Sequence, residues 1–397
     1  MLAVDGTDWG RLFHAYGVAT DTPRELRNLT ASDGGLRGQA IDHLFSAILH
    51  QGTIYPATPP AVRVVVTLLG EPSLRDPLAK GGSALGSALA FLAEVARSLA
   101  DIGPIDPPPL PAEADVAELF RQFHAEDEEE DWGSEVIGAL MARAVVDLRA
   151  MAGDMLVAVT PFLVDEAADV RCHAIDALSQ WGAIEPDGGA ARIAIGVIED
   201  RLVQVDDRDE GAGLILALGL FGHDLSARLD DPDEAVRTCA ALFVDDPKAV
   251  AQLITALTDP ANVNGWFVHR PSYFTVHVRF RLVAELIARQ VTIETMLPAA
   301  VALIAGASAM TADFEWGRIL QLAFPEQVEA FKPGQRPPLP AQLTDAQRAV
   351  LEALVANAAL WQPGNGNASL ARMRVGLSDD RGAVAEYCRS APPVRAG

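Results

Sequence analysis

One short phrase recurs along the chain: a branched apolar residue, an arginine, two variable positions and an alanine. It occurs at 36–44, 170–178 and 236–241, each time shortly after acidic residues, and a weaker copy begins at Val278. The first two arginines are 134 positions apart and the next two are 66 apart. Both separations are close to multiples of roughly 33, a spacing typical of stacked repeat units. The chain is therefore expected to stack similar helical units on one another.

The residues of the phrase suit this role. An acid before the phrase caps the next helix and favours its positive end. The small alanine lets a neighbouring helix approach closely. The arginines Arg37, Arg171 and Arg237 can each pair with an acid of their own or a neighbouring unit, and we expect them to be structural. Because the step from Arg237 to Arg279 is 42 residues, the repeat is not strict.

Helical periodicity predicts an all-α fold. Apolar residues recur at helical spacing over 41–49, 136–145 and 283–297, and no long stretch alternates apolar and polar residues. A first helix is expected to hold Trp9 and Phe13 and to end at Gly17. Residues 22–25 and 344–347 both have the pattern of a capping box at a helix start.

Breaks in the helical pattern divide the chain. We expect N-terminal units over 1–100, a Pro-rich and acidic loop region over 101–135, central units over 136–332 and a C-terminal helical cap over 341–397. The loops behind these boundaries are 101–111, the acidic run at 125–131 and the Pro-rich stretch at 333–340. A further loop is expected over 259–275.

The phrase D-x-x-V-R-x-x-A-x-x-x-L resembles the core of bacterial HEAT repeats of the short, phycobilin-lyase-like type. Residues 9–23, 50–60 and 360–382 are similar to segments of a group of bacterial HEAT-repeat proteins, common in actinobacteria and mostly without assigned activity. The resemblance implies an α-solenoid of stacked HEAT-like helical hairpins. It implies little about function, because such scaffolds carry many activities.

The charge of the chain narrows the class of partner. There are 31 basic and 54 acidic residues, a net charge of −23. Such a chain repels phosphate backbones and anionic membranes, which disfavours general nucleic-acid binding and membrane binding. A basic protein is the natural partner, since opposite potentials speed encounter. The alternative is that the charge only keeps the protein soluble.

The cysteines indicate a reducing compartment. Cys172, Cys239 and Cys388 are far apart and lack the CxxC spacing, which argues against a disulfide framework and a zinc site. The first residues have no basic or apolar leader, and no apolar run approaches the roughly 20 residues of a membrane span. We expect a cytoplasmic protein without a cofactor.

No catalytic phrase is present, and the first candidate site is a polar group near the N-terminus. It contains His14, His50, Gln51 and Tyr55, which interrupt otherwise apolar stretches. A metal-binding or acid–base role would need a carboxylate nearby, such as Asp21 or Asp42. The alternative is that the two histidines cap helix ends and hold the first units together.

Two further groups are candidates for binding a partner. One is an aromatic loop that contains Trp266, Phe267, His269, Tyr273 and Phe274. The other is the acidic run from Glu126 to Asp131 beside Trp132, which could receive a basic partner. The alternatives are a loop that packs its aromatic side chains onto its own helices and a solvated acidic loop.

The expected function is that of a non-catalytic scaffold that binds a basic protein, of which an immunity-type inhibitor or a regulatory binder is one version. One alternative is an enzyme on a HEAT-like scaffold, a lyase or small-molecule enzyme that uses the region of His14, His50 and Tyr55. The other is an architectural subunit of a larger assembly. The sequence leaves the oligomeric state open.

Overall fold

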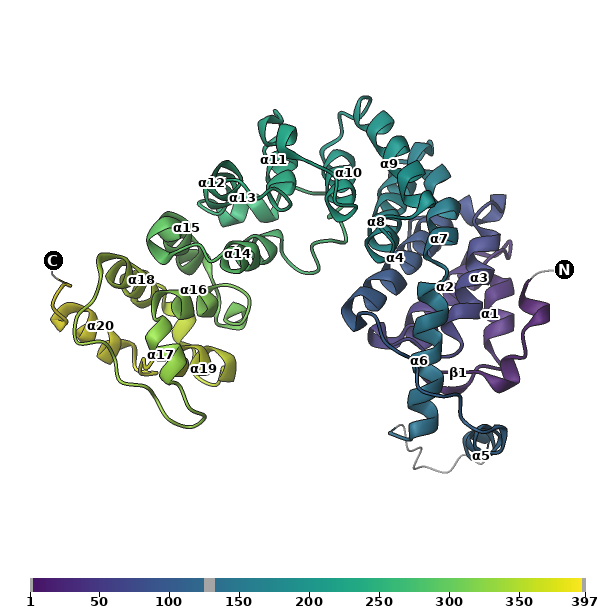
Figure 1. The fold of residues 1–397 in the computed structure, drawn as a ribbon, viewed down its shortest axis with the longest axis horizontal. Helices are drawn as coiled ribbons and strands as arrows, with labels where there is room; N and C mark the ends of the chain where they lie inside the picture. Colours follow the sequence, from purple (N-terminus) through teal and green to yellow (C-terminus); the bar gives the residue numbers. More distant parts are fainter. Residues whose placement is uncertain (1–2, 125–132, 395–397) are drawn as a thin grey trace. The chain divides into compact units, whose positions relative to one another are not determined.

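The computed structural model describes residues 3–124 and 133–394. The chain forms two compact units, Met1–His223 and Asp224–Gly397. The acidic run Glu126–Asp131 and Trp132, which are candidates for binding a partner, lie outside the described residues. The fold is predominantly α-helical, as expected, and Figure 1 shows the helices in chain order.

The helices of the first unit are α1 (Thr22–Asn28), α2 (Gly34–His43), α3 (Thr58–Leu68), α4 (Ala84–Ile102), α5 (Glu113–His124), α6 (Glu135–Arg149), α7 (Ala152–Val159), α8 (Ala168–Ile184), α9 (Gly189–Leu202) and α10 (Arg208–Leu220). Short 3₁₀ turns are η1 (Ala3–Gly6), η2 (Trp9–Arg11), η4 (His50–Gly52), η5 (Pro72–Arg75) and η6 (Thr160–Val164), and η3 (Leu44–Ile48) is a π-helical turn.

The helices of the second unit are α11 (Glu234–Ala241), α12 (Pro247–Ala256), α13 (Pro260–Asn264), α14 (Val278–Ala288), α15 (Ile293–Gly306), α16 (Trp316–Ala323), α17 (Pro325–Ala330), α18 (Asp345–Ala356), α19 (Gly366–Arg374) and α20 (Arg381–Ser390). The 3₁₀ turns are η7 (Ser226–Asp230), η8 (Ala309–Thr311) and η9 (Ala358–Trp361). No helix in the described ranges combines the length and the apolar character needed to cross a bilayer.

Helix α8 is central to the first unit, where it packs against α4, α7 and α10. Its core residues Leu178 and Trp181 are fully buried. The close approach to α10 depends on Gly182, because a Cβ atom there would lie 2.0 Å from the Phe221 ring. The small residue therefore fixes how tightly these two helices pack.

The N-terminal segment corrects two expectations. Instead of a helix ending at Gly17, strands β1 (Phe13–His14) and β2 (Gly17–Val18) form an antiparallel hairpin, the one sheet in the described residues. Gly17 has φ +101°, which suits a tight turn and not a helix end after Phe13. The capping box at residues 22–25 is also absent, because Asp21 is the cap residue and Thr22 already belongs to α1.

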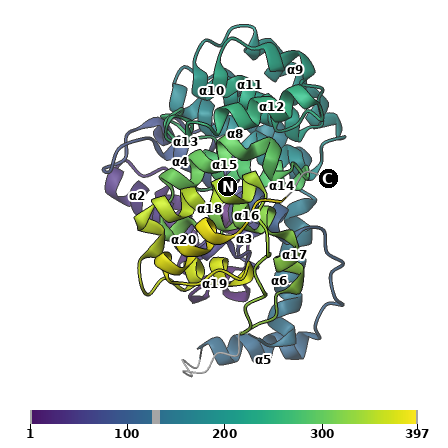
Figure 2. The same cartoon turned by 90° about the vertical axis from the view of Figure 1, so that its left-hand side faces the viewer.

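The hairpin belongs to a local core that α5 and α6 complete. Phe13 and Tyr55 pack with Phe120 and Ile137, and the rings of Phe13 and Phe120 are 6.4 Å apart. Figure 2 shows α5 at the end of α6, in agreement with Figure 1. The hydrophobic effect therefore holds the segments on both sides of residues 125–132 on the same core.

The recurring arginine has the same geometry in three places. The Nη1 atom of Arg37 donates to the carbonyl oxygens six and five residues earlier, at 2.6 and 3.1 Å. Arg171 does the same at 2.8 and 3.1 Å, and Arg237 at 2.6 and 2.9 Å. Each arginine thus ties the loop before its helix to the first turn, which explains why it recurs with the preceding acidic loop.

Pairing with acids follows the expectation at Arg171, whose Nε atom lies 3.1 Å from Glu210. The arginine of the weaker fourth copy, Arg279, also pairs with an acid, because its Nε atom donates to the buried Glu315 at 2.7 Å. The capping box at Thr344 and Gln347 is confirmed. The segment 259–275, expected to be a loop, begins with the short helix α13, since Asp259 caps it and Pro260 suits its first position.

Candidate functional site

Three side chains from separate elements meet at the N-terminal hairpin. His14 on β1 lies 2.9 Å through Nε2 from Oδ1 of Asp21, the cap residue of α1. His43, at the end of α2, lies 3.9 Å through Nδ1 from the other oxygen of Asp21. His14 and His43 are nearly buried, whereas the Asp21 side chain is 47% exposed. Of the two carboxylates considered from the sequence, Asp21 is the one that lies here.

The local fold explains this convergence. The hairpin turns the chain back so that Asp21 reaches His14 seven residues earlier. The change from α2 to the π-helical turn directly follows His43, so His43 and His50 do not share one regular helix face. Instead, the Nε2 atom of His43 lies 3.0 Å from the hydroxyl of Thr22, which is fully buried.

The electrostatics follow from burial and from the shared carboxylate. Partial burial raises the pKa of Asp21, but the hydrogen bond from His14 and the charges of both imidazoles outweigh it, so the pKa is below its usual value. Burial lowers the pKa of His43, attraction to Asp21 opposes this shift and repulsion from His14 adds to it. The neutral form of His43 is thus favoured.

His43 lies between the hydroxyl of Thr22 and the carboxylate of Asp21. A hydroxyl, a base and an orienting carboxylate in this order can form a catalytic triad. The Thr22 hydroxyl, however, has no exposed surface, so a substrate cannot reach it. In His14, Nδ1 accepts the backbone N–H of Tyr16 at 3.1 Å, so Nε2 carries the proton toward Asp21. Both nitrogens of His14 are engaged, and the geometry is that of a structural network.

His14, Asp21 and His43 are residue types that can bind a metal ion. Their ligand atoms lie within 4.8 Å of one another, a separation compatible with a shared cation. A neutral histidine that binds a metal through Nε2 must carry its proton on Nδ1. In His14 that nitrogen already faces the N–H of Tyr16, so two donors would confront each other. The donor set therefore does not fit a metal bound through His14.

The ring of Tyr16 links His50 to this network, and Gln51 follows His50 in the chain. The Tyr16 ring is 6.2 Å from His14 and 5.6 Å from His50. The Nδ1 atom of His50 is 3.0 Å from the carbonyl oxygen of Ser46, so His50 ends the preceding turn. Gln51 has φ +51°, a left-handed conformation that is unusual outside glycine.

Tyr55 lies on the other side of Phe13, with the two rings 6.5 Å apart and perpendicular. Burial raises its pKa above the ordinary value. The adjacent backbone is held by Thr58, whose hydroxyl accepts the N–H of Tyr55 and donates to the carbonyl oxygen of Ile48. Tyr55 thus contributes to the hairpin core.

The aromatic loop packs onto its own unit. Trp266 is 6% and Phe274 is 2% exposed. Phe267 stacks on Phe274 at 6.0 Å, and Tyr273 contacts Phe274 at 5.5 Å. The guanidinium of Arg281 covers the Tyr273 ring at 4.8 Å. His269 is half-buried. This is the self-packed arrangement that the sequence left open as the alternative.

The His43 network gives a testable pH dependence. Because the pKa of His43 is lowered, the unfolded chain binds more protons than the fold, and His43 reduces stability as the pH falls below about 6.5. Asp21→Asn removes the attraction that opposes this shift, so the pKa of His43 should fall further. NMR titration of the His43 ring protons measures it. Asp42→Asn, an exposed neighbour, is the matched control, and an equal or raised pKa in Asp21→Asn would contradict the network.

Four exposed apolar residues, not identified from the sequence, lie on α7, on η6, on α9 and directly after the end of α9. Val157, Val164, Ile193 and Val203 have 63%, 66%, 67% and 85% of their surfaces exposed. Their elements are neighbours, since α9 packs against both α7 and η6. We call these four residues the apolar group. In the sequence they are apolar residues off the buried helix face, and no polar motif marks them.

Exposed carboxylates lie on two of the same helices, α7 and α9, and in the loop before α9. Asp154 on α7, Asp200 on α9, and Glu185 and Asp187 in the loop before α9 form no ion pair with any residue in 3–124 or 133–394. The net charge also differs between the two units. Residues 1–223 contain 35 acidic and 15 basic side chains, and residues 224–397 contain 19 and 16, which gives net charges of −20 and −3. The acidity is therefore concentrated in the first unit.

Comparison with known proteins leaves the chain unassigned to a family. No protein-family model matches it, and neither a curated protein nor a solved structure does.

Proposed function

We propose that the chain is an α-solenoid of HEAT-like helical hairpins that binds a basic protein through its first unit. The observation that carries the proposal is that the exposed apolar group and exposed unpaired carboxylates lie on the same neighbouring elements, α7, η6, α9 and the residues that flank α9. Exposed apolar side chains within a polar rim are typical of protein interaction surfaces.

The solenoid part of the proposal rests on the recurring arginine. Arg37, Arg171 and Arg237 each bond the carbonyl oxygens six and five residues earlier. A sequence phrase that returns with one side-chain geometry supports a repeated structural unit. Stacked units of this type present long surfaces to protein partners.

The choice of a basic partner rests on charge. With −20 on the first unit, a cationic protein is attracted over a distance that depends on ionic strength. Such steering raises the rate of association and rejects acidic competitors. The histidine network supports no competing catalytic role, because its hydroxyl is buried and both nitrogens of His14 are engaged.

Capture from an extract of the native host, with the tagged full-length protein, tests the proposal. The wild type should retain a basic protein that Val157→Ser/Ile193→Ser retains about 5- to 30-fold less, since two apolar contacts contribute about 1–2 kcal/mol. Val268→Ser/Val276→Ser is the matched control, because both valines are exposed on the second unit. No retained protein, or equal loss in both double variants, would count against the first unit as the binding surface.

A further inference from the structure

A pocket of about 960 Å³ lies within the second unit. Its walls come from the turn between α14 and α15, from α16, and from the ends of α18 and α19. The volume falls in the range of roughly 300–1,000 Å³ found for sites of small organic ligands. The pocket has no part in the proposed protein binding of the first unit.

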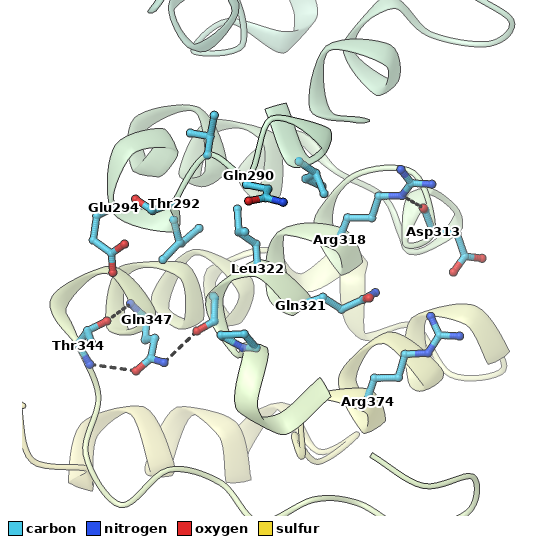
Figure 3. A pocket seen from close by; sticks show the side chains of 15 residues that line it. Gln290, Thr292, Glu294, Asp313, Arg318, Gln321, Leu322, Thr344, Gln347 and Arg374 are labelled. Atoms are coloured by element: carbon cyan, nitrogen blue, oxygen red, sulfur yellow. Dashed lines mark hydrogen bonds between the residues drawn. The ribbon is translucent and has the colours of Figure 1, made fainter. Parts of the chain in front are cut away.

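The polar groups of the pocket separate into two ends (Figure 3). Arg318 and Arg374 lie at one end together with the side chain of Asp313, and Glu294 lies at the other. Leu322 and Gln321 come between them, because α16 turns Ile319 and Leu320 into the core. With two arginines and one carboxylate, the first end is basic on balance, and the pocket thus has a basic end, an apolar middle and an acidic end.

Several polar groups in the walls of the pocket already have hydrogen-bond partners within the protein. Thr344 and Gln347 bond each other through the capping box, and Gln347 Nε2 donates to the carbonyl oxygen of Ala323 at 2.9 Å. Arg318 Nε donates to the carbonyl oxygen of Asp313 at 2.8 Å, which leaves its two terminal nitrogens for another acceptor. These bonds hold the walls in place and leave Arg374 and the two terminal nitrogens of Arg318 unused.

Arg374 is the exception in this unit. Among the arginines described in 224–394, only Arg270 and Arg374 form neither a hydrogen bond nor an ion pair. Arg270 is exposed, whereas Arg374 is half-buried and lines the pocket. A partly buried cation without a partner is costly, and an oxyanion that accepts bonds from its fork would compensate it. Gln321 is also without a hydrogen bond in the described part of the chain and can add a donor.

We infer that this pocket binds a small organic molecule with an oxyanion at one end, an apolar middle and a hydrogen-bond donor at the other end. The oxyanion, a carboxylate or a phosphate, accepts from Arg374, Arg318 and Gln321. The apolar middle lies along Val291 and Leu322, and the donor reaches Glu294.

Isothermal titration of the full-length protein with octanoate, octyl phosphate and octylamine tests the basic end. Octanoate or octyl phosphate should bind and octylamine should not, and the tighter of the two anions identifies the head group. Arg374→Gln should weaken the binding by roughly tenfold or more, through loss of a charge-assisted hydrogen bond. Arg270→Gln, the matched control, should leave it unchanged.

The acidic end has its own test. ω-Aminooctanoate should bind more tightly than octanoate, and Glu294→Gln should remove that difference. Because Arg374 contacts no partner, its variant should keep the wild-type thermal midpoint, which separates loss of binding from loss of fold. The inference is overturned if no probe binds, if octylamine binds as well as the anions, or if Arg374→Gln behaves like Arg270→Gln.

Discussion

Glu210→Gln should destabilise the first unit by about 3–5 kcal/mol, the cost of removing one partner of a buried ion pair. Glu210 is 1% exposed and accepts the Nε protons of both Arg171 and Arg201. The two arginine side chains are only 16% and 20% exposed. Glutamine keeps the shape but loses the charge, and its NH₂ group would face an arginine donor.

Chemical denaturation monitored by tryptophan fluorescence measures this effect. Asp200→Asn is the matched control, because Asp200 is an exposed acid on α9, and it should change the stability by less than about 0.5 kcal/mol. Arg171→Ala should cost roughly 1–3 kcal/mol, since Arg201 still balances Glu210. A Glu210→Gln variant as stable as Asp200→Asn would show that the ion pair between Arg171 of α8 and Glu210 of α10 does not stabilise the unit.

Trp181→Ala should destabilise the same unit by about 3–5 kcal/mol, because it empties the largest side chain from the contact between α8 and its neighbours. Trp181→Phe should cost clearly less. The indole N–H of Trp181 is buried and has no hydrogen-bond partner among the described residues, so phenylalanine removes an unsatisfied donor together with part of the ring.

Thermal and chemical unfolding of the two Trp181 variants provide the comparison. If Trp181→Phe were as unstable as Trp181→Ala, the ring volume would not explain the loss. The indole nitrogen would then have to make a stabilising bond.

Much of the helical structure could be predicted from the sequence, because apolar periodicity and caps are local signals. The capping box at Thr344 is confirmed, since the bonds depend only on residues three apart. The similar pattern at Thr22 failed because tertiary structure competed for the side chain: His43 takes the hydroxyl of Thr22. The helix expected before Gly17 also failed, because Phe13 is drawn into a core with α5 and α6 that is distant in sequence.

The candidate sites were less predictable than the fold. His14 was identified as a candidate, and Asp21 was one of two carboxylates considered for it, but only the fold adds His43 to the pair. The apolar group and the pocket depend on which helix faces stay uncovered, and one sequence does not contain that information. Val157 and Arg374 look like ordinary helix residues until their neighbours are known.

An acidic binding surface on the first unit can be tested with two charge variants, whose retention of the captured partner is measured at low and at high ionic strength. One variant neutralises Asp154, Glu185, Asp187 and Asp200 of the first unit, and the other neutralises Asp245, Glu326, Glu329 and Glu352 of the second, an equal loss of charge. We expect high salt and the first variant each to weaken retention by about tenfold, whereas the second variant should bind like the wild type. Retention that is independent of salt, or equally reduced by both variants, would contradict an acidic binding surface on the first unit.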